Sequence, residues 1–104
     1  MRAESLKGHL DALVLAVLRD EPAHGYAVIE QLKLRSGGAF DLPEGTVYPV
    51  LHRLEAEGLL TSSWSSASGR KRRVYRLTRR GLGALARQRD EWKSFANAVQ
   101  AVLA

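Results

Sequence analysis

The sequence predicts a single, mainly helical domain with a small β-hairpin. Apolar residues recur at helical spacing in three segments of the first half, and two short segments rich in Thr, Trp, Val and Tyr follow them. A long apolar stripe then occupies the last quarter of the chain. With 104 residues, of which 45% are hydrophobic and 26% charged, the composition is that of one globular domain.

An amphipathic pattern predicts the first helix over roughly residues 5–19. Leu15 falls on the side opposite to the main stripe, and apolar residues on both sides indicate a helix buried from two directions. Pro22 ends the segment, because the residue before a proline is disfavoured in helical conformation. The stripe itself consists of Leu6, Leu10, Leu13, Val14 and Val17.

The second and third helices are predicted from shorter stripes. The second begins near His24–Gly25 and ends at the stop signal Ser36-Gly37-Gly38, with Tyr26 at the edge of its stripe. The third begins around Pro43–Glu44, where proline and an acidic residue are both favourable, and Gly58 follows its end. The stripes are Gly25, Val28, Ile29 and Leu32 in the second helix, and Val47, Val50, Leu51 and Leu54 in the third.

Pro49 lies inside the third predicted helix and interrupts its pattern. An interior proline loses one backbone hydrogen bond of the helix. Two interpretations stay open: either the helix begins nearer Thr46, or Pro49 kinks it.

Two short strands are predicted after the third helix, over residues 59–64 and 70–77. Their β-branched and aromatic residues favour strands, and the polar loop Ser65-Ser66-Ala67-Ser68-Gly69 joins them into a β-hairpin. Alternation along the second strand sends Lys71, Arg73, Tyr75 and Leu77 to one face and Arg70, Arg72, Val74 and Arg76 to the other.

Thr78 is suited to cap a last helix that runs to about Leu103. Such a helix is about 37 Å long, more than a three-helix core covers, so something else must bury its far end. Leu85, Trp92 and Val99 repeat every seven residues, which is typical of a packing seam. One side of this helix carries Leu82, Leu85, Trp92, Phe95, Ala96, Val99, Val102 and Leu103.

Three helices, a hairpin and a long helix, in this order, are the elements of a winged helix-turn-helix followed by a dimerisation helix. We therefore expect residues 1–78 to form a DNA-binding domain and residues 79–104 a C-terminal dimerisation helix. The net charge of +5 agrees with this division, because the stretch from Gly58 through Arg89 contains nine basic residues and no acidic residue. The rest of the chain has a net charge of −4. The basic stretch indicates an anionic partner, and the simpler alternative is a solvated charged face.

Several classes of function are not supported. The chain has no Cys, which excludes a disulfide framework, a thiolate nucleophile and a Cys-ligated zinc site. His9, His24 and His52 fall on three different predicted helices, and the motifs of P-loops and serine hydrolases are absent. We therefore expect no enzyme, no metal and no cofactor. The longest apolar-rich run, Leu10 to Leu18, is too short for a membrane span and lacks a cleavage site after it, so a cytoplasmic protein is expected.

Four segments and one tryptophan together match a known pattern. They are His24-Gly25-Tyr26, Glu44-Gly45-Thr46-Val47-Tyr48-Pro49-Val50-Leu51, Arg53-Leu54-Glu55-Ala56-Glu57-Gly58-Leu59-Leu60, Arg73-Val74-Tyr75-Arg76-Leu77-Thr78-Arg79-Arg80-Gly81, and Trp92. In this order and spacing the chain resembles the PadR-type transcriptional regulators, of the short subfamily with a single C-terminal helix. One departure is the hairpin tip, where many relatives have a Gly-Pro-Pro-Arg-Lys-like sequence and this chain has Gly69-Arg70-Lys71-Arg72-Arg73.

The resemblance implies a homodimeric DNA-binding repressor whose dimer is built from the first and last helices. The third helix would be the recognition helix and the hairpin the wing. Some members of the family hold aromatic drugs between paired tryptophans at the dimer centre, and Trp92 resembles that position.

The third helix and the hairpin carry the candidate DNA-binding residues. Opposite its buried stripe, the third helix presents small or hydrogen-bonding residues that can approach base edges in the major groove, and the hairpin presents cations for phosphates. The simpler alternatives are a plain solvent face, a helical Arg53–Glu57 pair and a solubilising loop. The candidates are Tyr26, Thr46, Tyr48, Pro49, His52, Arg53, Arg70, Lys71, Arg72, Arg73 and Arg76.

Leu15, Trp92, Phe95, Ala96 and Val99 are the candidates for a dimer core or an effector site. A plain dimer core is favoured, because aromatic residues at helical spacing are usually packing residues. The alternative is a gap between the two Trp92 side chains that admits a planar aromatic molecule and thereby shifts DNA affinity.

The function predicted from these observations is repression of transcription by a homodimer, relieved by a small aromatic effector. Two-fold symmetry predicts a pseudo-palindromic operator in double-stranded DNA, with half-sites about 34–36 Å apart or a multiple of that. Two alternatives are a winged-helix module for protein–protein contact and a non-specific, nucleoid-type DNA binder.

Overall fold

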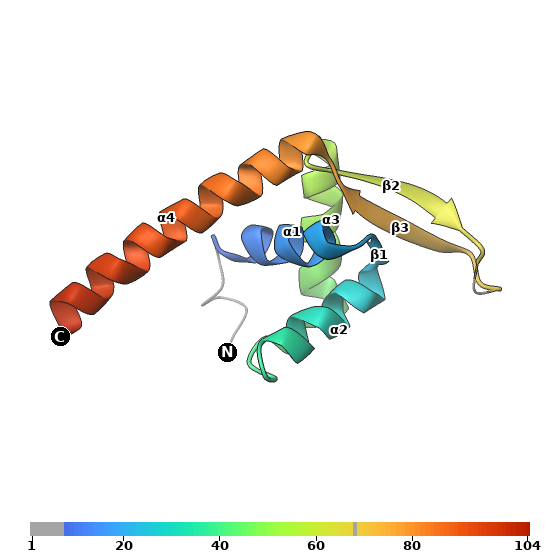
Figure 1. Cartoon of the computed structure of the whole chain (residues 1–104). Helices are drawn as coiled ribbons and strands as arrows, with labels where there is room; N and C mark the ends of the chain where they lie inside the picture. Colours follow the sequence, from blue (N-terminus) through green and yellow to red (C-terminus); the bar gives the residue numbers. More distant parts are fainter. Residues whose placement is uncertain (1–7, 68) are drawn as a thin grey trace.

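Four helices and a three-stranded sheet form the structure, a computed structural model that describes residues 8–67 and 69–104 (Figure 1). The predicted fold class is confirmed: the chain is mainly helical, with a small β-hairpin and a long C-terminal helix. The elements are α1 (Leu10–Asp20), β1 (Ala23–His24), α2 (Gly25–Arg35), α3 (Glu44–Ala56), β2 (Leu60–Ser65), β3 (Arg72–Leu77) and α4 (Arg79–Leu103).

α1 is the central helix and packs against α2, α3, α4 and β3. It is buried from two directions as predicted. The helix begins at Leu10, later than expected, because Gly8 adopts a φ of +90°, a left-handed conformation that a helix does not continue through. Leu6, which the sequence assigns to this helix, lies outside the described residues. The buried side chains of α1 are Leu10, Val14, Leu15, Val17 and Leu18.

α2 and α3 begin and end close to the predicted positions because both carry local end signals. His24 precedes α2 in extended conformation, and Pro43 precedes α3 in the same way. At the end of α3, Gly58 adopts a φ of +79° and the amide of Leu59 donates to the carbonyl of Leu54 at 2.9 Å. This is the usual glycine-dependent way of closing a helix.

Pro49 lies inside α3, which begins at Glu44 and continues through the proline. Of the two interpretations left open by the sequence, the later start near Thr46 is therefore wrong. A proline at this position leaves the carbonyl of Gly45 without its helical donor. Gly45 and Pro49 are both exposed, so the interruption faces outward.

The sheet has the strand order β1-β3-β2, and both neighbouring pairs are antiparallel. β2 and β3 form the predicted hairpin with small differences at their ends, and Ser68 of its loop lies outside the described residues. The sequence does not predict β1, because two residues show no alternation. β1 is defined by the pairing of Ala23 with Tyr75 and of His24 with Val74.

α4 starts at the junction with the end of α3 and the end of β3. As predicted, Thr78 caps α4: its hydroxyl accepts a hydrogen bond from the amide of Gly81 at 3.0 Å. A Cβ atom at Gly81 would lie 2.1 Å from the carbonyl oxygen of Leu59, so only glycine allows this close approach.

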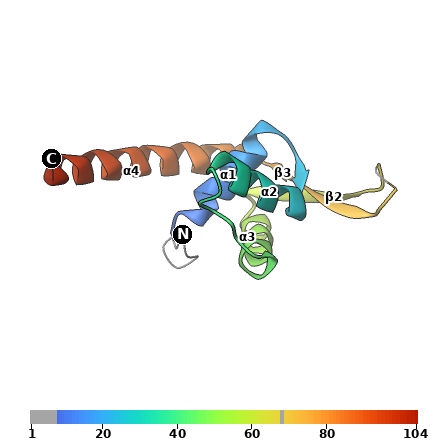
Figure 2. The same cartoon turned by 90° about the horizontal axis from the view of Figure 1, so that it is seen from below.

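Only the first part of α4 belongs to the core. Gly81, Ala84 and Leu85 are buried, and the rest of the helix projects from the body at the end opposite to the hairpin (Figure 2). The same apolar stripe continues along that projecting part, where all of its side chains except that of Ala96 are exposed. No helix of the described ranges has the length and apolar character needed to cross a membrane.

Candidate nucleic-acid interface

A groove of about 570 Å³ opens between the start of α2, α3 and the wing, which we define as the β2–β3 hairpin and its loop, residues 60–77. It brings together seven of the candidate DNA-binding residues from three elements. His24, Glu44 and Trp64 also line it, and the sequence does not single them out as DNA contacts. The seven candidates are Tyr26, Tyr48, His52, Arg70, Lys71, Arg72 and Arg73.

The other four candidates lie outside the groove. Thr46, Pro49 and Arg53 lie on α3, the first half-buried and the other two exposed. Arg76 is on the face of β3 opposite to the buried Tyr75, and it lines a second hollow of about 470 Å³ near the end of α1 and the start of α4. Neither hollow, nor any other part of residues 8–67 and 69–104, holds three His, Asp or Glu side chains that could bind a metal ion.

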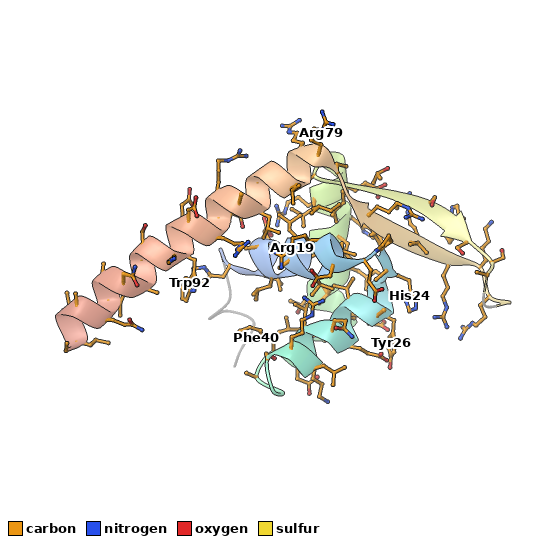
Figure 3. All side chains as sticks on the ribbon, viewed as in Figure 1. Arg19, His24, Tyr26, Phe40, Arg79 and Trp92 are labelled. Atoms are coloured by element: carbon orange, nitrogen blue, oxygen red, sulfur yellow. The ribbon has the colours of Figure 1, made fainter. Side chains whose placement is uncertain are left out.

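Gly25 sets how closely α2 approaches α3. A Cβ atom at this position would lie 2.6 Å from the ring of Tyr48, so the His24-Gly25-Tyr26 segment requires glycine in its middle. His24 and Tyr26 flank this point at the end of α2 that lies nearest the wing (Figure 3). Tyr48 lies within 6.4 Å of His52, measured between ring centroids, so these aromatic side chains form one side of the groove.

Arg53 is held by two carboxylates. Its Nη1 and Nη2 donate to the two oxygens of Asp11 on α1 at 3.0 and 2.5 Å, and Nη1 also reaches Glu57 Oε2 at 3.3 Å. The hydrogen bonds to Asp11 raise the pKa of Arg53 above its ordinary value. The Glu57 pair is the local alternative that the sequence allows, whereas the Asp11 pair ties α3 to α1.

His24 connects α2 to the wing. Its Nε2 lies 2.7 Å from Arg72 Nη1, and its Nδ1 lies 3.3 Å from the amide nitrogen of Ala27. A neutral imidazole has one acceptor nitrogen, so His24 accepts from Arg72 or from Ala27 but not from both at once. Burial lowers the pKa of His24, and the Arg72 guanidinium lowers it further, so both favour the neutral imidazole.

A polar network joins the wing to α3. Arg73 Nε donates to Ser62 Oγ at 2.7 Å, and Ser62 Oγ donates to Glu55 Oε2 at 2.6 Å. Arg73 Nη2 lies 3.8 Å from the same carboxylate oxygen. The middle of the wing is thereby fixed relative to α3.

Most described cations outside the basic stretch, though not Lys93, pair with a carboxylate, whereas most of those inside it do not. Outside it, Arg19, Lys33, Arg35 and Arg53 each form an ion pair with a carboxylate. Among the described residues of the stretch, Arg73 alone lies within 4 Å of one, at 3.8 Å. With few carboxylates nearby, most of these cations can pair with an external anion.

The candidate residues on α4 form an exposed aromatic surface. Trp92 and Phe95 are 52% and 58% exposed, and Trp92 makes an edge contact with His9, their ring centroids 5.0 Å apart (Figure 3). Ala96 and Val99 lie beside them, half-buried and exposed. Leu15, in contrast, is fully buried in the protomer core and does not reach this surface. The sequence does not predict the role of His9, because no pattern connects the start of α1 with the middle of α4.

Comparison with known proteins identifies relatives over most of the chain. The Transcriptional regulator PadR-like family matches residues 14–87. Transcriptional regulator Rv3488 of Mycobacterium tuberculosis is 41% identical over 80 residues, which cover 77% of this chain and 72% of that protein. An uncharacterized protein X of Lysinibacillus sphaericus is 30% identical over 93 residues, which cover 88% and 85%.

Solved structures agree with these matches. A PadR family transcriptional regulator from Eggerthella lenta superposes with a TM-score of 0.84 at 36% identity, covering 96% of this chain and 86% of that one. A PadR family transcription regulator from Clostridium difficile gives a TM-score of 0.81 at 31% identity, covering 92% and 99%.

Proposed function

The chain belongs to the PadR-like family of DNA-binding transcriptional regulators, and we propose that it acts as a homodimeric repressor of a pseudo-palindromic operator. The observation that carries the proposal is the groove, where α3 and four cations of the wing face the same space. In this proposal residues 1–78 bind DNA and residues 79–104 form the dimerisation helix.

α3 is proposed to be the recognition helix. Its exposed side is formed by small, aromatic or hydrogen-bonding residues, which allow close approach to base edges in a major groove about 12 Å wide. The proposed contacts of α3 with DNA are Thr46, Tyr48, Pro49, His52 and Arg53. Tyr26 of α2 is proposed to contact the DNA backbone beside them. Arg53 reaches DNA with the N–H groups that Asp11 and Glu57 leave free, or after leaving Asp11.

The wing is proposed to bind phosphates. Arg70, Lys71, Arg72 and Arg73 line the groove and have no carboxylate within 3.5 Å among the described residues. Each phosphate contact releases a counterion, so two wings give a steep dependence of affinity on salt.

The dimer is proposed to form through the second half of α4 and the start of α1. Leu85 begins an apolar stripe in the protomer core. Five exposed residues continue it along α4: Trp92, Phe95, Val99, Val102 and Leu103. A stripe that is apolar along its whole length, but covered by the described protomer only at its start, needs a second surface to bury the remainder. A second copy supplies the same stripe.

The aromatic surface around Trp92 is also the proposed effector site. Trp92 packs edge-on against His9, so a planar aromatic molecule between two Trp92 side chains would act on the start of α1 as well. Titration with planar cationic or phenolic compounds should quench tryptophan fluorescence, with a Trp64 variant removing the second signal. No quenching across a broad panel would leave Trp92 and Phe95 as plain dimer core.

Competition binding tests the proposed function. A duplex from upstream of the chain's own gene should displace a random duplex at much lower concentration. Equal affinity for any duplex would support a nucleoid-type binder. Weak binding that salt does not change would support a module for protein–protein contact.

A further inference from the structure

Trp64 is an exposed aromatic side chain on the groove side of the wing. It is 57% exposed and lines the groove. Leu60 and Trp64 share one face of β2, because side chains alternate along a strand. Leu60 is buried, whereas Trp64, further along the same strand, lies past the end of the core. Trp64 therefore contributes little to the packing of the protomer core.

Two cations lie over the ring of Trp64. Arg73 is its partner in the strand register, and Lys71 lies on the same face two residues earlier. Lys71 Nζ is 5.0 Å and Arg73 Cζ 5.4 Å from the ring centroid, both within cation–π distance. Arg73 is fixed further by its hydrogen bond to Ser62. The indole ring thus holds two long side chains in defined positions beside the groove.

This arrangement suits the backbone of a nucleic acid. A flat apolar ring can pack on a deoxyribose, while ammonium and guanidinium groups on its face can reach the phosphates on either side. Cations that are already ordered lose less conformational entropy when they bind, which favours contact through a held pair over contact through free side chains.

We propose that Trp64 binds the sugar–phosphate backbone of duplex DNA and positions Lys71 and Arg73 for the adjacent phosphates. This inference rests on the proposed function and adds Trp64 to the residues that carry it. Because the contact is made with the backbone, it is independent of base sequence, and a random duplex at low salt serves as the probe.

Fluorine NMR tests the contact directly. The chain has two tryptophans, so 5-fluorotryptophan labelling gives two resonances, and Trp64→Phe assigns one of them to Trp64. During titration with a random duplex of about 30 base pairs, three helical turns, the Trp64 resonance should shift in step with the complex seen in a gel-shift assay.

Affinity measurements test the positioning role. Trp64→Ala removes two cation–π interactions and should weaken duplex binding about tenfold, while Trp64→Phe keeps a smaller ring and should weaken it less. Leu34→Ala is the matched control, because it removes another exposed apolar side chain, 70% exposed and outside the groove. It should bind like the wild type. If Trp64→Ala does not fold, the shift of the Trp64 resonance and the affinity of Trp64→Phe still test whether Trp64 contacts the duplex.

The outcomes separate this inference from the proposed function. A duplex that binds without moving the Trp64 resonance, together with wild-type affinity of the Trp64 variants, overturns the inference and leaves the proposed function in place. A wild-type chain that binds no duplex overturns the proposed function, and the inference with it.

Discussion

Gly25 lets α2 lie against Tyr48 of α3, and a larger residue has no room there. We expect Gly25→Ala to lower the free energy of unfolding by about 1–3 kcal/mol, because the ring or the helix must move. Gly45→Ala is the matched control: nothing lies within 4 Å of the added Cβ, and it should raise stability by up to about 1 kcal/mol. Urea denaturation measures both, and equal effects would contradict the packing explanation.

Asp11 competes with DNA for the guanidinium of Arg53. We expect Asp11→Asn to tighten duplex binding and to steepen the slope of log affinity against log salt by about 0.9 per protomer, because one more cation becomes available. Asp20→Asn removes an equal charge that pairs with Arg19 and Arg35, outside the groove, and should change affinity little. Filter binding at several salt concentrations measures both variants. Weaker binding by Asp11→Asn would mean that Asp11 orients Arg53 toward DNA.

His24 makes stability depend on pH. Burial, and then the charge of Arg72, lowers its pKa in the folded state below the ordinary 6.5, so the unfolded chain takes up a proton first. The free energy of unfolding should therefore be highest above pH 6.5 and fall as pH decreases from 6.5 through the folded-state pKa. His24→Asn still suits the cap of α2 but does not titrate, so it should flatten this part of the profile.

Denaturation curves recorded above about pH 5 isolate the contribution of His24 to the free energy of unfolding, because carboxylates stay ionised there. The pKa of Asp20 is lowered overall, although burial alone would raise it, because its hydrogen bonds to Arg35 and Arg19 favour the carboxylate. Its contribution is lost only below its ordinary value of 3.8. An unchanged profile in His24→Asn would contradict the role of His24.

α4 serves the protomer core at its start and leaves an apolar surface along its second half. Phe95→Asp combined with Val99→Asp should leave the protomer folded, because both side chains are exposed in it. The two charges should nevertheless prevent dimerisation, because unpaired charges are costly in an apolar interface. We expect a folded monomer in analytical ultracentrifugation and circular dichroism.

The matched control adds the same charges to the opposite side of α4. Asn97→Asp combined with Ala101→Asp places two carboxylates at the same spacing, on exposed positions away from the apolar stripe. This variant should remain a dimer. If both double variants behave alike, the stripe is not the dimer interface.

The ends of the helices are marked by local signals in the sequence, whereas β1 is not. Thr78, Pro43 and Gly58 mark helix ends through contacts within a few residues, so the sequence locates α3 and α4 closely. β1 has no such signal, because its two residues are strand only through their pairing with β3, about 50 residues later in the chain.

The cations that face the groove from the wing differ in their partners from those on α2. Of the former, only Arg73 lies within 4 Å of a carboxylate among the described residues, whereas Lys33 and Arg35 each pair with one. Lys71→Gln with Arg72→Gln should flatten the salt slope by about 0.9 for each phosphate that the variant no longer neutralises. Lys33→Gln with Arg35→Gln removes the same charge from residues that pair with Asp41 and Asp20, and should leave the slope nearly unchanged. Equal slopes for both variants would contradict a specific role of the wing.

The sequence by itself determined the order of the helices and the hairpin, the resemblance to the family, and the position of the basic stretch. These depend on periodicity, end signals and composition, which are properties of neighbouring residues. Only the tertiary structure decided which cations are engaged and by what. Arg53 meets Asp11 across 42 residues, and Arg72 meets His24 across 48. No local pattern encodes such pairs, because packing of the helices and the sheet creates them.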